Sequence, residues 1–191
     1  MKATDRFTSA DLAAFPDNDG KRYEIIDGEL FVSKQPHRHH QDVCFQAASK
    51  LQQASSRGEG RAYIAPGVIF ADDDDVAPDI IWISSARVSA FGPDGHLHGA
   101  PELIVEVLSP GKANERRDKE AKLDLYSRRG VSEYWIVDWR ARLVEIFRRK
   151  DSGLVKVATL TESDTLTTPL LPALSCRVAE LFMGIPKSEP D

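Results

Sequence analysis

The sequence has 191 residues, of which 41% are hydrophobic and 29% charged, the composition of an ordinary globular protein with its own core. It contains no apolar run near the roughly 18 residues that a membrane span needs, and no apolar leader at its start, so we expect a cytoplasmic protein. The formal net charge of -5 argues mildly against strong non-specific DNA binding, although cations gather between residues 112 and 129.

The first half of the chain predicts a hairpin, a long helix and three further strands. The pair Asp27-Gly28 between two strand patterns is a strong hairpin signal. The acidic run at 72–75 lacks the spaced ligands and the glycine of a calcium loop, so we expect a solvated loop there. The expected elements are strands at 23–26 and 29–32, a helix at 37–55, and strands at 61–64, 68–71 and 79–83.

The second half predicts a strand, helix and strand in succession, followed by an antiparallel pair. A strand–helix–strand order is typical of a crossover unit with parallel strands. We therefore expect an α/β fold with a mixed central sheet flanked by helices, as one domain over 1–185 with a polar tail at 186–191. The expected elements are a strand at 103–108, a helix at 114–129 ending at Gly130, strands at 131–137, 143–148 and 154–160, and a short helix at 178–183.

The cysteines and the first histidines show no spacing that is typical of a structural metal site. Cys44 and Cys176 lie far apart, so we expect two reduced, partly buried thiols. His37, His39 and His40 are too closely spaced for a usual structural zinc pattern, so a turn at the start of a helix is the expected setting.

Two acidic residues stand in strongly apolar strand patterns. Glu106 is the one charged residue from 103 to 108, and alternation places it on the same face as Ile104 and Leu108. Asp79 opens another apolar strand directly after a proline. A carboxylate inside such a strand is costly unless it is paired or binds a metal. A structural ion pair for Glu106 and a turn role for Asp79 remain open, but together the two acids indicate a site for a hard cation.

Lys122 lies on the apolar face of the following helix. Asp118, Ala121, Lys122, Leu125 and Tyr126 follow the spacing of one helical face. A lysine in this stripe either extends along the surface to solvent or reaches a carboxylate beneath it. The periodicity leaves both alternatives open.

At this point the sequence resembles a known nuclease superfamily. Pro78-Asp79 and Glu106-Val107-Leu108 resemble the core motif of PD-(D/E)xK nucleases, in which a lysine usually stands where this chain has Leu108. The Uma family of bacterial putative restriction endonucleases shares this departure and moves the lysine to the next helix. The chain is similar to this family from about 7 to 182, through the segments 22–30, 40–41, 78–79, 101–110, 118–126 and 130–138.

The resemblance implies a restriction-endonuclease-like core and a magnesium-dependent endodeoxyribonuclease, with manganese as a substitute metal. It implies that Asp79 and Glu106 bind the metal, that Glu24 assists, and that Lys122 and His40 act in catalysis. From the residues alone, Glu24 is equally an exposed hairpin charge, and His40 belongs to a helix-start turn.

DNA is the substrate that the resemblance implies. The alternative is a catalytically inactive nuclease fold that serves as a DNA-binding or protein-interaction scaffold. Cutting both strands of a duplex often uses two symmetric sites, so a homodimer also stays open.

Overall fold

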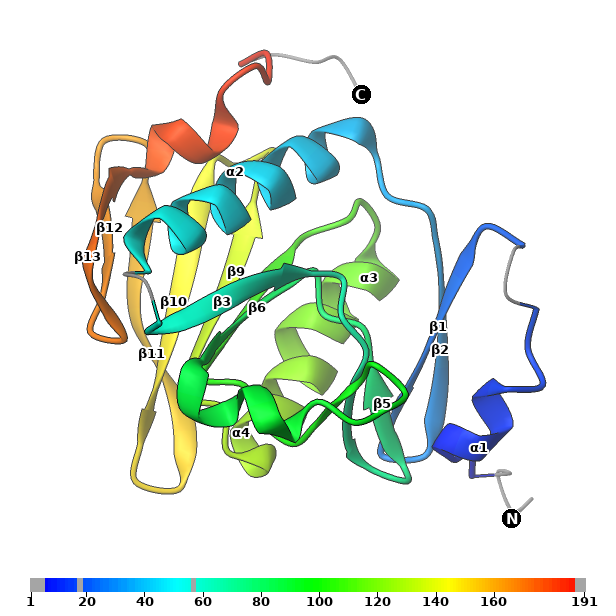
Figure 1. Cartoon of the computed structure of the whole chain (residues 1–191). Helices are drawn as coiled ribbons and strands as arrows, with labels where there is room; N and C mark the ends of the chain where they lie inside the picture. Colours follow the sequence, from blue (N-terminus) through cyan, green and yellow to red (C-terminus); the bar gives the residue numbers. More distant parts are fainter. Residues whose placement is uncertain (1–5, 17–18, 56–57, 188–191) are drawn as a thin grey trace.

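A six-stranded mixed sheet runs through the centre of the molecule (Figure 1). The computed structural model describes residues 6–16, 19–55 and 58–187, and at residues 112 and 113 it describes the backbone alone. In the order β11-β10-β9-β8-β6-β3, the pair β8 and β9 is parallel and the other neighbouring pairs are antiparallel. The strands are β3 (Gly60–Ile64), β6 (Ile80–Ser84), β8 (Leu103–Val107), β9 (Glu133–Asp138), β10 (Leu143–Lys150) and β11 (Gly153–Thr161).

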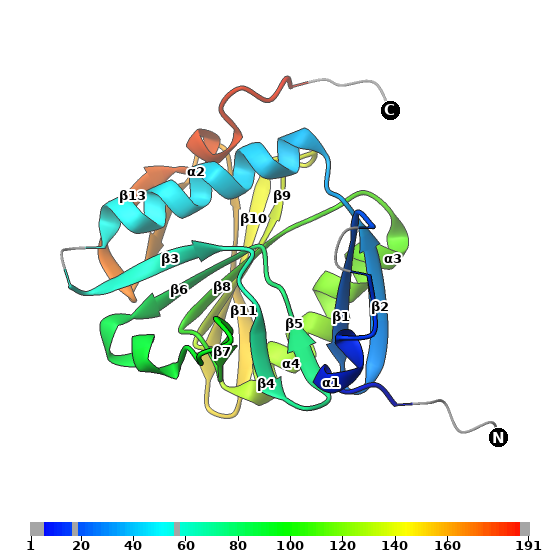
Figure 2. The same cartoon turned by 45° about the vertical axis from the view of Figure 1, so that its right-hand side comes forward.

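A second sheet stands beside the first, in the order β2-β1-β5-β4-β7 (Figure 2). The predicted hairpin is confirmed: β1 and β2 pair through a turn in which Asp27 and Gly28 have φ values of 52° and 73°. Two successive positive φ values are the mark of a type I′ turn, which matches the twist of the strands. The strands are β1 (Lys21–Ile26), β2 (Glu29–Lys34), β4 (Val68–Ala71), β5 (Asp74–Val76) and β7 (Leu97–His98).

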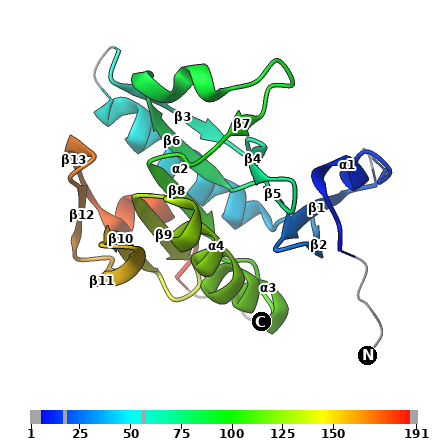
Figure 3. The ribbon, with the colours of Figure 1, turned by 90° about the horizontal axis from the view of Figure 1, so that it is seen from below.

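Helices cover both faces of the six-stranded sheet (Figure 3). Helix α2 (Arg38–Ala54) packs its apolar stripe, which includes Val43 and Leu51, against one face. Helix α4 (Lys122–Arg129) packs Leu125 and Tyr126 against the other face. Side chains of β8 alternate between the two faces of the sheet and so contribute to both hydrophobic cores. Leu103, Val105 and Val107 pack in the core with α2. Ile104, and Leu108 directly after the strand, pack in the core with α4. The expected α/β fold with a mixed central sheet flanked by helices is therefore confirmed.

The predicted helix between β8 and β9 contains a wide turn. α3 (Lys112–Arg116) leads into a π-helical turn (Arg117–Ala121), where the Lys122 N–H bonds the Arg117 carbonyl, and then into α4. π-turns inside helices are rare and frequent at functional sites. The helix ends at Gly130, whose φ of 91° is the left-handed C-terminal conformation that the sequence predicts.

The prediction of a solvated acidic loop at 72–75 was wrong for its second half. Asp74 and Asp75 lie in β5 and are buried. Asp74 accepts hydrogen bonds from Arg128 and Arg129, whose side chains come from the end of α4. These guanidinium groups compensate the burial of a charge that would otherwise require solvent.

The remaining elements are α1 (Ser9–Leu12), 3-10 turns at Ser85–Ala90 and Val178–Phe182, and the strand pair β12 (Thr165–Thr168) and β13 (Leu171–Arg177). The expected helix at 178–183 is thus a 3-10 turn, and it packs with β13 onto α2. Of the predicted tail, 188–191 lies outside the described residues. Within the described ranges, no helix has the length and apolar character required to cross a membrane.

Candidate active site

The register of the central sheet brings Asp79 and Glu106 together. Ile80 pairs with Val105 across the antiparallel strands β6 and β8, so the next residues outward, Asp79 and Glu106, face each other. The Asp79 amide lies 3.4 Å from Glu106 Oε2, and Asp79 Oδ2 accepts a hydrogen bond of 2.9 Å from the Val107 amide. Both side chains are buried, and the sheet register places these two residues side by side at the start of β6.

Lys122 reaches this pair from the helical side of the sheet. Its side chain is 0% exposed, and Nζ lies 2.8 Å from Oε1 of Glu24 and 2.8 Å from Oε1 of Glu106. Leu108, at the usual lysine position of the motif, is packed in the apolar core. The alternative of a lysine extending to solvent is therefore wrong, and the amine approaches Glu106 from α4.

Glu24 is buried in β1 rather than exposed on the hairpin, so the surface alternative for this residue is wrong as well. Its Oε1 accepts a hydrogen bond of 3.0 Å from the Ala77 amide, and Oε2 lies 3.8 Å from Arg117 Nη1. Burial opposes its ionisation, but the neighbouring Lys122 and Arg117 lower the pKa of Glu24. The second sheet thus supplies an ionised carboxylate to the group formed by the first.

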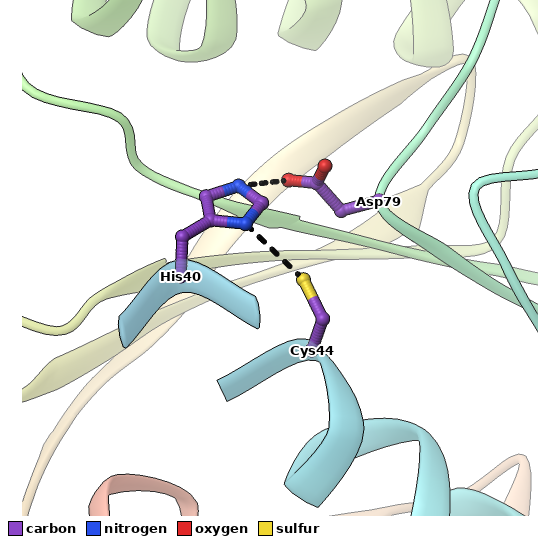
Figure 4. A group of neighbouring side chains, drawn as sticks. All are labelled: His40, Cys44 and Asp79. Carbon is purple, nitrogen blue, oxygen red and sulfur yellow. Dashed lines mark hydrogen bonds and ion pairs between the residues drawn. The ribbon is translucent and has the colours of Figure 1, made fainter. Parts of the chain in front are cut away.

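His40 and Arg22 bind Asp79 from opposite sides. His40 Nε2 lies 3.0 Å from Oδ2, and Arg22 Nη1 lies 3.1 Å from Oδ1. Burial favours the neutral acid, but the hydrogen bond and charge of His40 and the charge of Arg22 hold the pKa of Asp79 well below its usual range. His40 lies in the first turn of α2, as expected, and is buried against the site (Figure 4).

Glu106 has the opposite electrostatic setting. Burial, opposed by the Lys122 ammonium and reinforced by the negative charge of Asp79, raises the pKa of Glu106 to about 8. Its Oε1 also accepts a hydrogen bond of 2.7 Å from the Tyr126 hydroxyl. Asp79 and Glu106 thus have pKa values displaced in opposite directions, a pattern that is frequent at functional sites.

A cavity of about 360 Å³ opens onto the site. Asp79 and His40 lie in its wall, together with the cationic side chains Arg22, Lys34 and Arg117. Strand β2 and the segment that leads into α2 form one side, and residues 109–117 contribute to the other. A recess with the Asp79 carboxylate and three cationic side chains in its wall fits an anionic backbone that approaches a bound metal.

The types of donor atom fit a hard divalent cation, but Glu24, Asp79 and Glu106 do not form a compact group of three ligands. Among the described residues, the one group of potential ligands whose donor atoms all lie within 4.8 Å of one another is His40, Cys44 and Asp79. Glu24, Asp79 and Glu106 provide buried carboxylate oxygens, the ligands that magnesium and manganese favour. With Asp118 there are four buried carboxylates near the three cations Arg22, Arg117 and Lys122 and near His40. A divalent cation would stabilise the ionised form of these carboxylates.

The sequence analysis overlooked four members of this cluster as site residues. Arg22 lies two positions before Glu24 and therefore on the same strand face, a signal that alternation offers. Tyr126 follows Lys122 by one helical turn, so the same stripe that contains Lys122 could have indicated it. Arg117 and Asp118 pair with each other at 2.9 Å within the π-turn, which no pattern in the sequence predicts.

Comparisons with known proteins identify a family for this chain and match its fold. The model of the family Uma2, described as "Putative restriction endonuclease", matches residues 9–179. Among solved structures, the chain is similar to "a putative nuclease belonging to DUF820 from Anabaena variabilis", with a TM-score of 0.74 and 17% identity over 92% of this chain and 97% of that chain. This likeness shows a shared fold, and no curated protein matches. Because the family model spans most of the sequence, the chain belongs to the Uma2 family of putative restriction endonucleases.

Proposed function

We propose that this protein is a metal-dependent endonuclease that hydrolyses phosphodiester bonds of DNA. One observation carries the proposal: Glu106 contacts both the Asp79 amide and Lys122, and Asp79 lies in the wall of a recess that also contains cationic side chains. The proposed metal ligands are Asp79 and Glu106, with Glu24 assisting, and the proposed metal is magnesium, with manganese as a substitute.

A bound magnesium ion would supply positive charge to the reacting phosphate and would lower the pKa of the attacking water. Lys122 has two roles that follow from its contacts. It holds Glu24 and Glu106 in position through its two contacts of 2.8 Å, and its charge would stabilise the negative charge that develops on the phosphoryl oxygens. His40 acts as a positioning residue, because it binds one oxygen of Asp79 and thereby fixes the orientation of this carboxylate.

DNA is proposed as the substrate because of the family description and the character of the recess. Lys34 is exposed on β2, and Asn114 begins the opposite wall, so both flank the route to Asp79. Contacts of this kind bind phosphates without reading sequence. The net charge of -5 is compatible with such a site, because three cationic side chains, Arg22, Lys34 and Arg117, line the recess.

The test is nicking of supercoiled plasmid with magnesium, comparing the parent with Asp79→Asn, Glu106→Gln and Lys122→Met. We expect each variant to lose on the order of 100-fold in rate, as when one charge-stabilising group is removed from an active site. Glu120→Gln is the matched control, because Glu120 is an exposed acid on the same helical segment and pairs with Arg116 at the surface.

Cleavage by all three variants at the rate of the parent would overturn the proposed roles. No cleavage by the parent with magnesium or manganese, on plasmid or single-stranded DNA, would overturn the enzymatic proposal and favour the scaffold alternative. In that case, calorimetry would also show no magnesium binding that Glu106→Gln abolishes.

A further inference from the structure

A second group of potential metal ligands adjoins the proposed active site. His40, Cys44 and Asp79 are all buried, and their donor atoms lie within 4.8 Å of one another (Figure 4). His40 and Cys44 occupy successive turns of α2, so the helix holds both on the same face. Asp79 faces them from the start of β6. Among the described residues this is the one such group with both a sulfur and a nitrogen donor.

The donor set differs in kind from that of the proposed magnesium site. Thiolate and imidazole favour zinc and related ions, whereas magnesium favours oxygen. Cys44 Sγ lies 3.5 Å from His40 Nδ1. Ligand atoms at about 2.0–2.3 Å from one tetrahedral zinc ion are ~3.3–3.7 Å apart, so this pair already has the spacing of two zinc ligands.

Asp79 completes the group as a carboxylate. Its Oδ2 lies 3.0 Å from His40 Nε2, while Arg22 contacts the other oxygen, Oδ1. A histidine that ligates a metal through one ring nitrogen commonly donates its other N–H to a carboxylate, which fixes the ring. The contact with Asp79 therefore supports ligation through Nδ1, on the side of Cys44.

We propose that Cys44 and His40, with Asp79 as the adjoining carboxylate, form a binding site for a zinc-class cation. The Cys44 thiol is protonated without metal, because burial raises its pKa. On binding, the S–H bond breaks, a sulfur–metal bond forms and the proton goes to solvent. No change of oxidation state is involved, and waters from the recess beside His40 and Asp79 would fill the two remaining positions of a tetrahedral ion.

Binding at this site has a consequence for the proposed nuclease. A zinc-class ion on His40 Nδ1 would lie one imidazole ring away from Asp79, whose Oδ2 contacts Nε2, and repulsion between the two cations would weaken magnesium binding at Asp79. We therefore expect zinc to inhibit cleavage even when magnesium is in excess. This inhibition rests on the proposed function, whereas the binding itself does not.

The test uses cobalt(II) as a spectroscopic substitute for zinc, titrated into the full chain that has been stripped of metal. The parent should bind one equivalent and show a thiolate-to-cobalt charge-transfer band that zinc abolishes. Cys44→Ser should lose the band and at least 10-fold in affinity. Cys176→Ser should retain both, because Cys176 is the other free, buried thiol and lies outside the cluster.

His40→Gln is a second variant, in case serine at the buried position 44 unfolds the protein, and thermal melting checks each chain. Absence of the band in the parent would overturn the proposal, as would its retention in folded Cys44→Ser or His40→Gln, or its loss in Cys176→Ser. If the charge-transfer band appears in a protein that cleaves no DNA, the proposed zinc-class site is supported and the proposed nuclease function is overturned. If the protein cleaves DNA but shows no band, the nuclease function is supported and the zinc-class site is overturned.

Discussion

Lys122→Met removes one charge from the centre of the carboxylate cluster and keeps the length of the side chain. Lys122 is 0% exposed, and its ammonium is the shared partner of Glu24 and Glu106, each of which is 1% exposed. Removing one partner from a buried ion pair leaves an uncompensated charge and typically costs about 3–5 kcal/mol. We expect a loss of this size in the free energy of unfolding at pH 8.5.

The loss should be smaller at pH 5.5. Without Lys122 the pKa values of both glutamates in the folded protein rise, so the folded state binds more protons than the unfolded state above the ordinary glutamate pKa of about 4.3. The free energy of unfolding then falls as the pH rises towards the folded pKa values. The two acids can be neutral at pH 5.5, which relieves part of the cost.

Urea unfolding followed by tryptophan fluorescence measures both effects. Lys156→Met is the matched control, because Lys156 pairs with Glu145 on the surface of the β10–β11 hairpin and is 45% exposed. Its loss should stay below about 1 kcal/mol at either pH. The assignment of Lys122 as the counter-charge of the cluster would be refuted by either of two results. One is a free energy of unfolding for Lys122→Met equal to that of the parent at pH 8.5, and the other is an equal loss of this free energy at both pH values.

Three further predictions concern other parts of the molecule. Asp74→Asn should lose about 1.5–3 kcal/mol at pH 7 in urea unfolding. Burial opposes the ionisation of Asp74, but hydrogen bonds from Arg128, Arg129 and the Asp27 amide lower its pKa. The stability that the ionised carboxylate contributes is therefore present above the ordinary aspartate pKa, and the difference between Asp74→Asn and the parent should shrink at pH 3. Gly130→Ala should cost about 1 kcal/mol in the same assay, because φ is 91° and no described atom beyond its neighbours would clash with a Cβ. Lys34→Ala should weaken DNA binding for all sequences and reduce the salt slope by about one in fluorescence anisotropy; an unchanged slope would contradict the proposed role of the recess.

Much of the fold follows from local patterns. The hairpin at Asp27-Gly28, the helix after His37 and the strand containing Glu106 depend on turn chemistry and periodicity, which lie within a few residues of one another. The parallel pairing of β8 and β9 follows from the strand–helix–strand order. These predictions are confirmed because neighbouring residues alone decide them.

The pair Asp79 and Glu106 could be predicted to approach because both interrupt apolar strands that must be buried. The burial of Asp74 could not, because its partners Arg128 and Arg129 lie more than fifty residues away. The acidic composition of residues 72–75 predicted a solvated loop, but the ion pairs of Asp74 with the two arginines stabilise its burial. The β12–β13 pair was also missed, since its strands cover the side of α2 instead of joining the central sheet.

The contact between His40 and Cys44 could be predicted in part from the sequence. Four residues separate them on one helix, so a helical reading places their side chains together. Asp79 approaches His40 because it directly precedes β6, and no pattern in the sequence shows that β6 begins beside α2. Function-bearing clusters of this kind assemble from distant segments, and their exact membership depends on the three-dimensional fold.

The central claim is that Asp79 and Glu106 bind one divalent cation. A crystal of the parent soaked in manganese, measured at a wavelength where manganese scatters anomalously, tests it directly. The account predicts an anomalous peak between the two carboxylates that is lost in Glu106→Gln. Absence of the peak in the parent, with Arg22 and Lys122 still bound to the acids, would contradict it.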